Sequence, residues 1–303
     1  MPRIRYWSLQ GQQLRNPNSY TKKALRGFFS GRKIICHNGL MLLAIPAIFF
    51  AYGLLFGSFL NAWIWRIHTD RKISKGRSIC PHCKSQLKWY ELIPVLSWLV
   101  LRGKCRTCHK PISIQYPLVE LATGILWVGL YSFINPTSGL EWGELVVWLI
   151  VGTLMMAAFV YDAKWMLLPD HFTVPAIVAA LIWVGIRWMV YGQGGLVLQQ
   201  LIAALVFAGM FYALWRLSGG GWLGDGDIRL AFLMGLMLTP NQLVIAIFVS
   251  FNLGALVSLW LLATKRKTRR DPIAFGPFLI IGLLTGYFGA DALIVAYLHI
   301  LSI

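Results

Sequence analysis

Residues 219–235 read GGGWLGDGDIRLAFLMG, and the interpretation of the whole chain depends on this stretch. A glycine-rich turn leads through Asp225 and Asp227 directly into the apolar segment 228–238. Ionisable groups at membrane depth are costly and rare, so two carboxylates at the start of an apolar segment indicate a functional site. The glycines let the backbone adopt conformations that are closed to other residues. The alternative is a polar loop between two membrane spans, with one aspartate capping the next helix.

The composition is that of a polytopic membrane protein. Of the 303 residues, 57% are hydrophobic and only 13% are charged, whereas soluble domains carry about 25% charged residues. The excess of 28 Lys+Arg over 11 Asp+Glu would indicate nucleic-acid binding in a soluble chain. Here the basic residues lie between apolar segments, where they set the topology and contact anionic lipid. No nucleic-acid partner is therefore predicted.

The hydropathy pattern predicts an all-α fold of about eight transmembrane helices. The segment 228–238 is too short to cross a bilayer, so we expect a partial or tilted span there. The polar tail of residues 1–39 holds no apolar run of signal-peptide length, and no cleavable signal is expected. The eight apolar segments are 40–65, 117–134, 144–161, 172–190, 197–217, 228–238, 243–263 and 275–300.

Two basic loops predict the topology. Residues 66–110 hold 11 Lys/Arg against two acids, and residues 265–270 read KRKTRR, so both loops should be cytoplasmic. Counting spans from these loops also places Asp162, Asp225 and Asp227 at cytoplasmic ends. The same count places the basic tail outside. Either the denser loop overrides the tail, or translation starts at Met41.

A second acidic segment supports aspartic chemistry. Residues 161–170 read YDAKWMLLPD, with Asp162 at a predicted helix end and Asp170 after a proline. Two carboxylates that face each other do not both ionise easily, so one keeps its proton near neutral pH. The ionised one can then take a proton from water while the other polarises a peptide carbonyl. This favours Asp162 and Asp227 as a catalytic pair, whereas Asp170 could equally cap the next helix.

Four cysteines in the first basic loop predict a zinc site. Cys80-Pro-His-Cys83 and Cys105-Arg-Thr-Cys108 are two CxxC pairs separated by 21 residues, a pattern typical of four-thiolate zinc. Because all four positions are filled, the metal would be structural. The alternatives are two disulfides, which a reducing cytoplasmic loop disfavours, and four unrelated thiols. The neighbouring His82 and His109 are not expected to be ligands, and Cys36 in the tail reads as a plain thiol.

Five sequence blocks, in this order, resemble those of the type IV prepilin peptidases, over about residues 53–282. The blocks are GSFLNAWIWR (57–66), the cysteine segment 80–124, YDAKWMLLPD (161–170), GDGDIRL (224–230) and FGPFLIIG (275–282).

The resemblance implies a bifunctional enzyme of the bacterial inner membrane. It would cleave the leader of prepilins or pseudopilins after a glycine on the cytoplasmic side, and then methylate the new amino terminus with S-adenosylmethionine. The division of the chain would be a tail (1–39), a first transmembrane helix (40–65), a cytoplasmic tetracysteine zinc domain between helices one and two (66–116) and a transmembrane aspartic peptidase domain (117–303).

The resemblance also assigns residues. The family's catalytic aspartates map onto Asp162 and Asp227, and its zinc ligands onto Cys80, Cys83, Cys105 and Cys108. Its methylation-linked glycine maps onto Gly103. Arg229 stands where many members have lysine. The supporting residues would be Gly224, Gly226, Asp170, Asp225 and Arg229.

Two other functions fit part of the pattern. A presenilin-like protease shares Tyr161-Asp162 and the GxGD run of residues 224–227, but the Pro-Ala-Leu block that it requires is missing. A proton-coupled transporter could use Asp162 and Asp227 as a relay, although no internal repeat is seen. The prepilin peptidase interpretation is preferred. It leaves open which prepilins are served and the oligomeric state.

Four aspartates would together create a negative electrostatic potential that attracts a basic leader peptide. They are Asp162, Asp170, Asp225 and Asp227.

Overall fold

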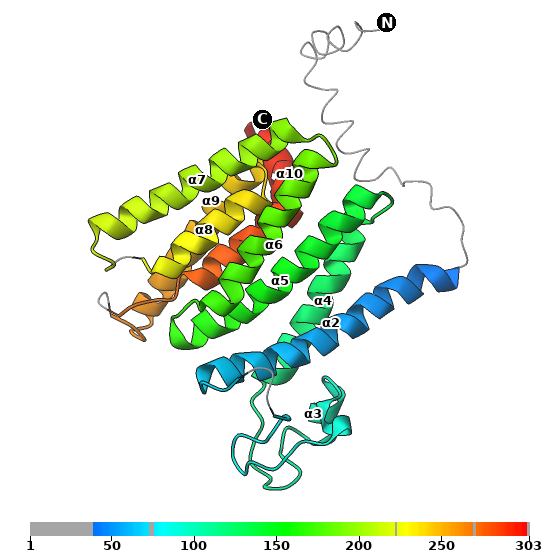
Figure 1. The fold of residues 1–303 in the computed structure, drawn as a ribbon. Coiled ribbons are helices and arrows are strands. Elements are labelled where there is room, and N and C mark those ends of the chain that lie inside the picture. Colours follow the sequence, from blue (N-terminus) through cyan, green and yellow to red (C-terminus); the bar gives the residue numbers. More distant parts are fainter. Residues whose placement is uncertain (1–38, 73–75, 222, 269–270, 302–303) are drawn as a thin grey trace, which may run out of the picture. The chain divides into compact units, whose positions relative to one another are not determined.

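The computed structural model describes residues 39–72, 76–221, 223–268 and 271–301. Within these ranges the regular secondary structure is helical; turns and loops connect the helices, and there are two isolated β-bridges and no strand. Each of the eight predicted apolar segments forms one helix, which confirms the predicted fold class (Figure 1). Residues 1–38 of the predicted tail, including Cys36, lie outside the described residues. The eight helices are α2 (Gly39–His68), α4 (Gln115–Ile134), α5 (Gly139–Trp165), α6 (Asp170–Met189), α7 (Gly194–Leu217), α8 (Asp225–Met237), α9 (Pro240–Ala263) and α10 (Gly276–Leu301).

The chain divides into two compact units. One comprises residues 1–44 and 294–303, whose described part is the first turns of α2 and the last turns of α10. The other comprises residues 45–293 and contains both the acidic segments and the cysteine loop.

Six of the described helices are long and apolar enough to cross a membrane. They are α2, α4, α5, α6, α7 and α9. The helix α8 has only 13 residues, about 20 Å at 1.5 Å per residue, and is shorter than a bilayer core. The short sixth segment predicted from the sequence is therefore confirmed.

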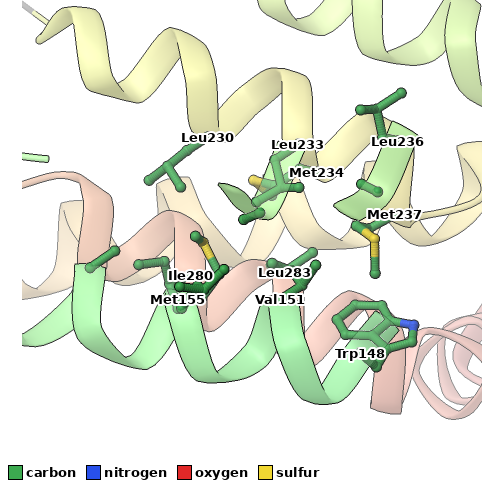
Figure 2. Close-up of a cluster of buried hydrophobic side chains, with 14 of the residues drawn as sticks. Trp148, Val151, Met155, Leu230, Leu233, Met234, Leu236, Met237, Ile280 and Leu283 are labelled. Carbon is green, nitrogen blue, oxygen red and sulfur yellow. The ribbon is translucent and has the colours of Figure 1, made fainter. Parts of the chain in front are cut away.

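The short helix α8 is buried by its neighbours. Nine of its 13 residues are buried, among them Asp227. It contacts α6, α7 and α9, and Gly235 packs against the backbone of Ala204 on α7. Figure 2 shows its apolar side chains meeting those of α5 and α10, where Trp148, Met155 and Ile280 are labelled. A helix that is apolar on all sides belongs in the interior, and here the interior holds one of the acidic segments.

Small residues allow the closest helix approaches. A Cβ atom at Gly53 would lie 2.7 Å from the Cα atom of Gly124, and one at Gly57 would lie 2.7 Å from that of Glu120. These contacts allow α2 to pack closely against α4. At the other side of the unit, Gly286 lies against the carbonyl of Gln242, which joins α10 to α9.

Both basic loops and both acidic segments lie on one face of the bundle. The helix α5 ends near Asp162 and α8 begins at Asp225, while the loop 264–275 leads into the start of α10. His68, at the end of α2 where the cysteine loop begins, stacks on Trp165 at the end of α5 with ring centroids 4.0 Å apart. The cysteine loop therefore emerges on the same face as the aspartates.

Candidate active site and metal centre

Asp162 lies in the last turn of α5 and is buried, with 4% of its surface exposed. Its backbone carbonyl accepts a hydrogen bond from Met166, which ends the helix in a left-handed conformation. The carboxylate faces Gly276, the first residue of α10, where a Cβ atom would lie 2.5 Å from Oδ2. Only a glycine lets the start of α10 approach this carboxylate so closely.

Asp227 is the third residue of α8 and has 6% of its surface exposed. Its Oδ2 accepts a hydrogen bond from the backbone N–H of Gly224, at 3.1 Å. The side chain thus caps the helix start, as the alternative reading of the sequence allowed, but it does so from a buried position. An acidic group there also interacts favourably with the helix dipole.

Leu168 brings the two carboxylates to one site. This residue follows α5, and a Cβ atom at Gly226, beside Asp227, would lie 2.5 Å from the Cβ atom of Leu168. The same leucine lies 3.1 Å from a Cβ position at Gly276, which in turn contacts Asp162. The charges of Asp162 and Asp227 are close enough to interact. Three segments far apart in sequence therefore meet around two buried carboxylates.

The other two aspartates of the acidic segments are exposed and paired with one cation. Arg229 forms ion pairs with Asp170 at the start of α6 and, at 2.9 Å, with Asp225 at the start of α8. Asp170 is the first residue of α6; Pro169 precedes the helix, and no side-chain cap is made there. The capping alternative for Asp170 is therefore wrong. Arg229 also offsets part of the negative charge expected from the four aspartates.

Substituting alanine for Gly276 tests the close approach of α10 to Asp162. The added methyl group would collide with Oδ2, because Cβ atoms are not found within 3.0 Å of another heavy atom. Displacing a reacting group by about 1 Å can lower a rate roughly 10²-fold. We expect the rate of leader cleavage, the activity that the resemblance implies, to fall by this order in Gly276→Ala. Gly289→Ala on the same helix is the control, since its Cβ atom would meet only Thr285 at 3.9 Å. Equal activity of the two variants would contradict this packing argument.

The two CxxC pairs form two turns of the same geometry. In the first, the N–H of Cys80 donates to Ser85 and that of Lys84 donates to Cys80, with Lys84 at φ 60°. In the second, the N–H of Cys105 donates to Lys110 and that of His109 donates to Cys105, with His109 at φ 56°. An isolated β-bridge closes each turn.

The four thiols converge on one point. Their Sγ atoms all lie within 4.8 Å of one another, and those of Cys80 and Cys108 are 4.0 Å apart. Tetrahedral zinc with bonds of about 2.3 Å needs sulfur atoms about 3.8 Å apart, so the donor set and its spacing fit this ion. All four cysteines are free thiols, which contradicts the disulfide alternative.

Hydrogen bonding shapes the acidity of the cluster. The Ser85 hydroxyl and amide lower the pKa of the Cys83 thiol to about 6. The amides of Cys108 and Thr107 also lower the pKa of Cys105. For Cys108 the amide of Lys110 acts in the same direction, but burial and the other thiols outweigh it and raise the pKa to about 11. Metal binding requires all four groups as thiolates.

Gly103 has a backbone conformation and a close neighbour that a residue with a side chain could accommodate only with strain. Its φ is 67°, and a Cβ atom there would lie 2.9 Å from the Trp98 ring. Its carbonyl accepts a hydrogen bond from Ile112, whose own carbonyl accepts one from the Trp98 indole. This glycine therefore holds the second cysteine turn against the short helix α3 (Leu96–Val100).

The structure adds two buried polar residues to which the sequence interpretation gave no role. Asn61 on α2 donates to the carbonyl of Tyr116 and accepts from the Gln115 side chain. Glu120 on α4 accepts a hydrogen bond from the N–H of Val95, at 2.7 Å. Asn61 fastens the end of the cysteine loop to the bundle, and Glu120 fastens its middle, between the two CxxC pairs. The available signal was a polar residue inside an apolar span.

Comparisons with known proteins show which family this chain resembles. Residues 51–134 match the family model of the bacterial peptidase A24 N-terminal domain, and residues 148–259 match the type IV leader peptidase family. No solved structure matches the chain.

Three similar proteins are all named prepilin leader peptidase/N-methyltransferase. The one from Aeromonas hydrophila is 33% identical over 78% of this chain and 87% of its own. The one from Bacillus subtilis is 31% identical over 83% of this chain and 97% of its own. The one from Myxococcus xanthus is 38% identical over 73% of this chain and 64% of its own. With two family models matched in order and such relatives along most of its length, the chain belongs to the type IV leader peptidase family.

Proposed function

We propose that this protein is a prepilin leader peptidase and N-methyltransferase. It cleaves the leader of type IV prepilins or pseudopilins after a glycine, and it methylates the amino terminus that is released. The observation that carries the proposal is the meeting of two buried carboxylates, Asp162 and Asp227, at one face of a membrane bundle. Ionisable groups in that setting are costly to bury, which is why a catalytic role explains them better than a structural one.

Asp162 and Asp227 act as the catalytic pair. One carboxylate is ionised and takes a proton from water, whose oxygen attacks the carbonyl carbon of the glycine. The other is protonated and donates a hydrogen bond to the carbonyl oxygen as it becomes negative. The C–N bond then breaks, and the leaving amine takes up the proton that the first carboxylate removed from water. Gly276, Gly226 and Leu168 position the pair for these steps.

The amino-terminal methylation belongs to the cysteine loop of residues 66–116. S-adenosylmethionine would supply the methyl group to the amine released by cleavage. Gly103 is the residue of this chain that the family links to methylation, and its packing on Trp98 suggests that it acts by shaping the loop. The peptidase activity belongs to residues 117–303, which carry both aspartates.

Zinc holds the cysteine loop together. Cys80, Cys83, Cys105 and Cys108 would bind the ion, and no position remains for a reacting water. The ion would therefore act as a structural link between the two turns.

The protein works in the bacterial inner membrane with its aspartates facing the cytoplasm. The support is that both Lys/Arg-rich loops lie on the face that carries Asp162 and Asp227. The same basic residues are positioned to contact anionic lipid headgroups. The expected partners are prepilins or pseudopilins and the lipid bilayer, without nucleic acid.

The experiment is mass spectrometry of a purified prepilin incubated with this protein, with and without S-adenosylmethionine. We expect loss of the leader in both samples, and a methyl group on the new amino terminus only when the cofactor is present. Cleavage without methylation would refute the second activity alone. If no pilin-like substrate were cleaved, the peptidase proposal would be wrong and proton-coupled transport would be tested next.

The exposed Asp225 provides a test of leader recognition. Because its carboxylate attracts basic residues but lies outside the buried pair, Asp225→Asn should raise KM for a prepilin a fewfold and change kcat little. The increase in KM should shrink for a prepilin with fewer basic leader residues, and also at high salt. A KM that responds to leader charge in the same way in both proteins would refute this role.

A further inference from the structure

The segment between the two cysteine pairs exposes a cluster of large apolar side chains. The cluster is formed by the 3-10 helix η2 (Trp89–Leu92), by Ile93 directly after it and by α3. The two helices contact each other and contain no buried residue. Trp89 and Val100 are 75% and 77% exposed. Such patches mark interaction sites on soluble surfaces. We call this the η2–α3 cluster; its members are Trp89, Leu92, Ile93, Leu96, Leu99 and Val100.

A hydrogen bond to a buried carboxylate fixes the depth of this cluster. The N–H of Val95, which immediately precedes α3, donates to Oε2 of Glu120 at 2.7 Å. Glu120 is on α4, five residues after its first residue Gln115, and is 6% exposed. At 1.5 Å per residue this is about 8 Å along a membrane-spanning helix. The start of α3 is therefore held beside the first turns of α4, at the level of the lipid headgroups, rather than out in water.

The charge around the cluster is basic. Residues 84–106 contain five Lys/Arg and one acid, Glu91. That acid already pairs with Arg106, at 3.6 Å. Lys88 immediately precedes η2, and Arg102 follows α3. Apolar side chains flanked by cations are the pattern of elements that lie in the interface of an anionic membrane.

We propose that the η2–α3 cluster inserts into the surface of an anionic lipid membrane beside α4. The lipid is the chosen partner because Glu120 fixes the depth and the flanking residues have the complementary charge. The insertion anchors the cysteine loop on the membrane at a third point, in addition to the ends of α2 and α4. This inference is independent of the catalytic proposal.

Photocrosslinking of the full-length protein tests the contact directly. The protein is placed in nanodiscs of phosphatidylcholine and phosphatidylglycerol, with p-benzoylphenylalanine at Val100 or, as control, at Thr107, an exposed residue between two cysteines. We expect phospholipid adducts by mass spectrometry at Val100 and far fewer at Thr107. Absence of lipid adducts at Val100, or adducts instead with a second copy of the chain or with an added prepilin, would overturn the proposal.

Hydrogen exchange tests the dependence on lipid charge. The backbone amides of residues 89–101 should exchange roughly threefold more slowly in anionic than in phosphatidylcholine nanodiscs, because the basic residues draw the segment into the interface. The double variant Leu99→Asp, Val100→Asp should lose this difference. Both side chains are exposed, so the variant should fold, and an unchanged zinc content would show that it has. Equal exchange of the unmodified protein in the two lipids would contradict the proposal.

Discussion

Replacing Asp227 by asparagine is expected to abolish leader cleavage, and replacing Asp162 should do the same. Each substitution keeps the shape of a buried side chain but removes a group that can accept or donate the proton in the reaction. General acid–base catalysis contributes about 10²–10⁴-fold, and the loss should be at least of this order for either variant. The measurement is the rate of leader release from a purified prepilin, followed by mass spectrometry.

Two controls separate catalysis from folding. Asp70→Asn changes an exposed aspartate at φ 52°, a conformation that asparagine also tolerates, and should leave cleavage unchanged. Both buried variants should still methylate a prepilin supplied without its leader, because the cysteine loop does not contain either aspartate. Cleavage by Asp227→Asn at a rate near that of the unmodified enzyme would show that another residue carries the chemistry.

Replacing the buried Cys105 by serine is expected to eliminate zinc binding and methylation together. Loss of one of four thiolates leaves the two turns without their common link, and structural zinc sites supply much of the folding free energy of small loops. Cleavage should fall less, because Asp162, Asp227 and Leu168 all lie outside residues 66–116. The measurements are the zinc content per chain, methyl incorporation and leader release from the same preparations.

His82 provides the matched control for the cysteine variant. It lies between Cys80 and Cys83 and is exposed, so His82→Ala should keep the zinc and the methylation activity. Removing zinc from the unmodified protein with a chelator should reproduce the effect of Cys105→Ser. If the chelator removed zinc and methylation continued unchanged, the metal would have no role in the activity of the loop.

The helices could be predicted from the sequence because a lipid environment demands long apolar segments with internally bonded backbones. The eight segments therefore correspond to eight helices, including the short α8. The first and last residues of the helices could be predicted less closely than their number. The segment predicted at 144–161 forms a helix from Gly139 to Trp165, since Ser138 and Glu141 cap it five residues earlier and the helix continues past Asp162.

The cysteine cluster could also be predicted, because its four thiols follow a spacing that is local in sequence. Each CxxC pair forms a turn by its own hydrogen bonds, and only the meeting of the two turns requires the fold. For Asp170 the local signal was misleading. A residue between a proline and an apolar run reads as a helix cap, but the long side chain of Arg229 reaches it from another helix.

The sequence by itself determined the class of protein, the number of apolar helices and the residue types that are proposed to carry the chemistry. Only the tertiary structure decided that Gly276 and Leu168 complete the aspartate site, that α8 is enclosed by its neighbours, and that Glu120 holds Val95. The hydropathy of a segment predicts that its side chains are removed from water, but it does not predict which helix they pack against. That choice is made by the fit of small and large residues between helices. Some of these contacts join positions more than a hundred residues apart, as that of Gly276 with Asp162 does.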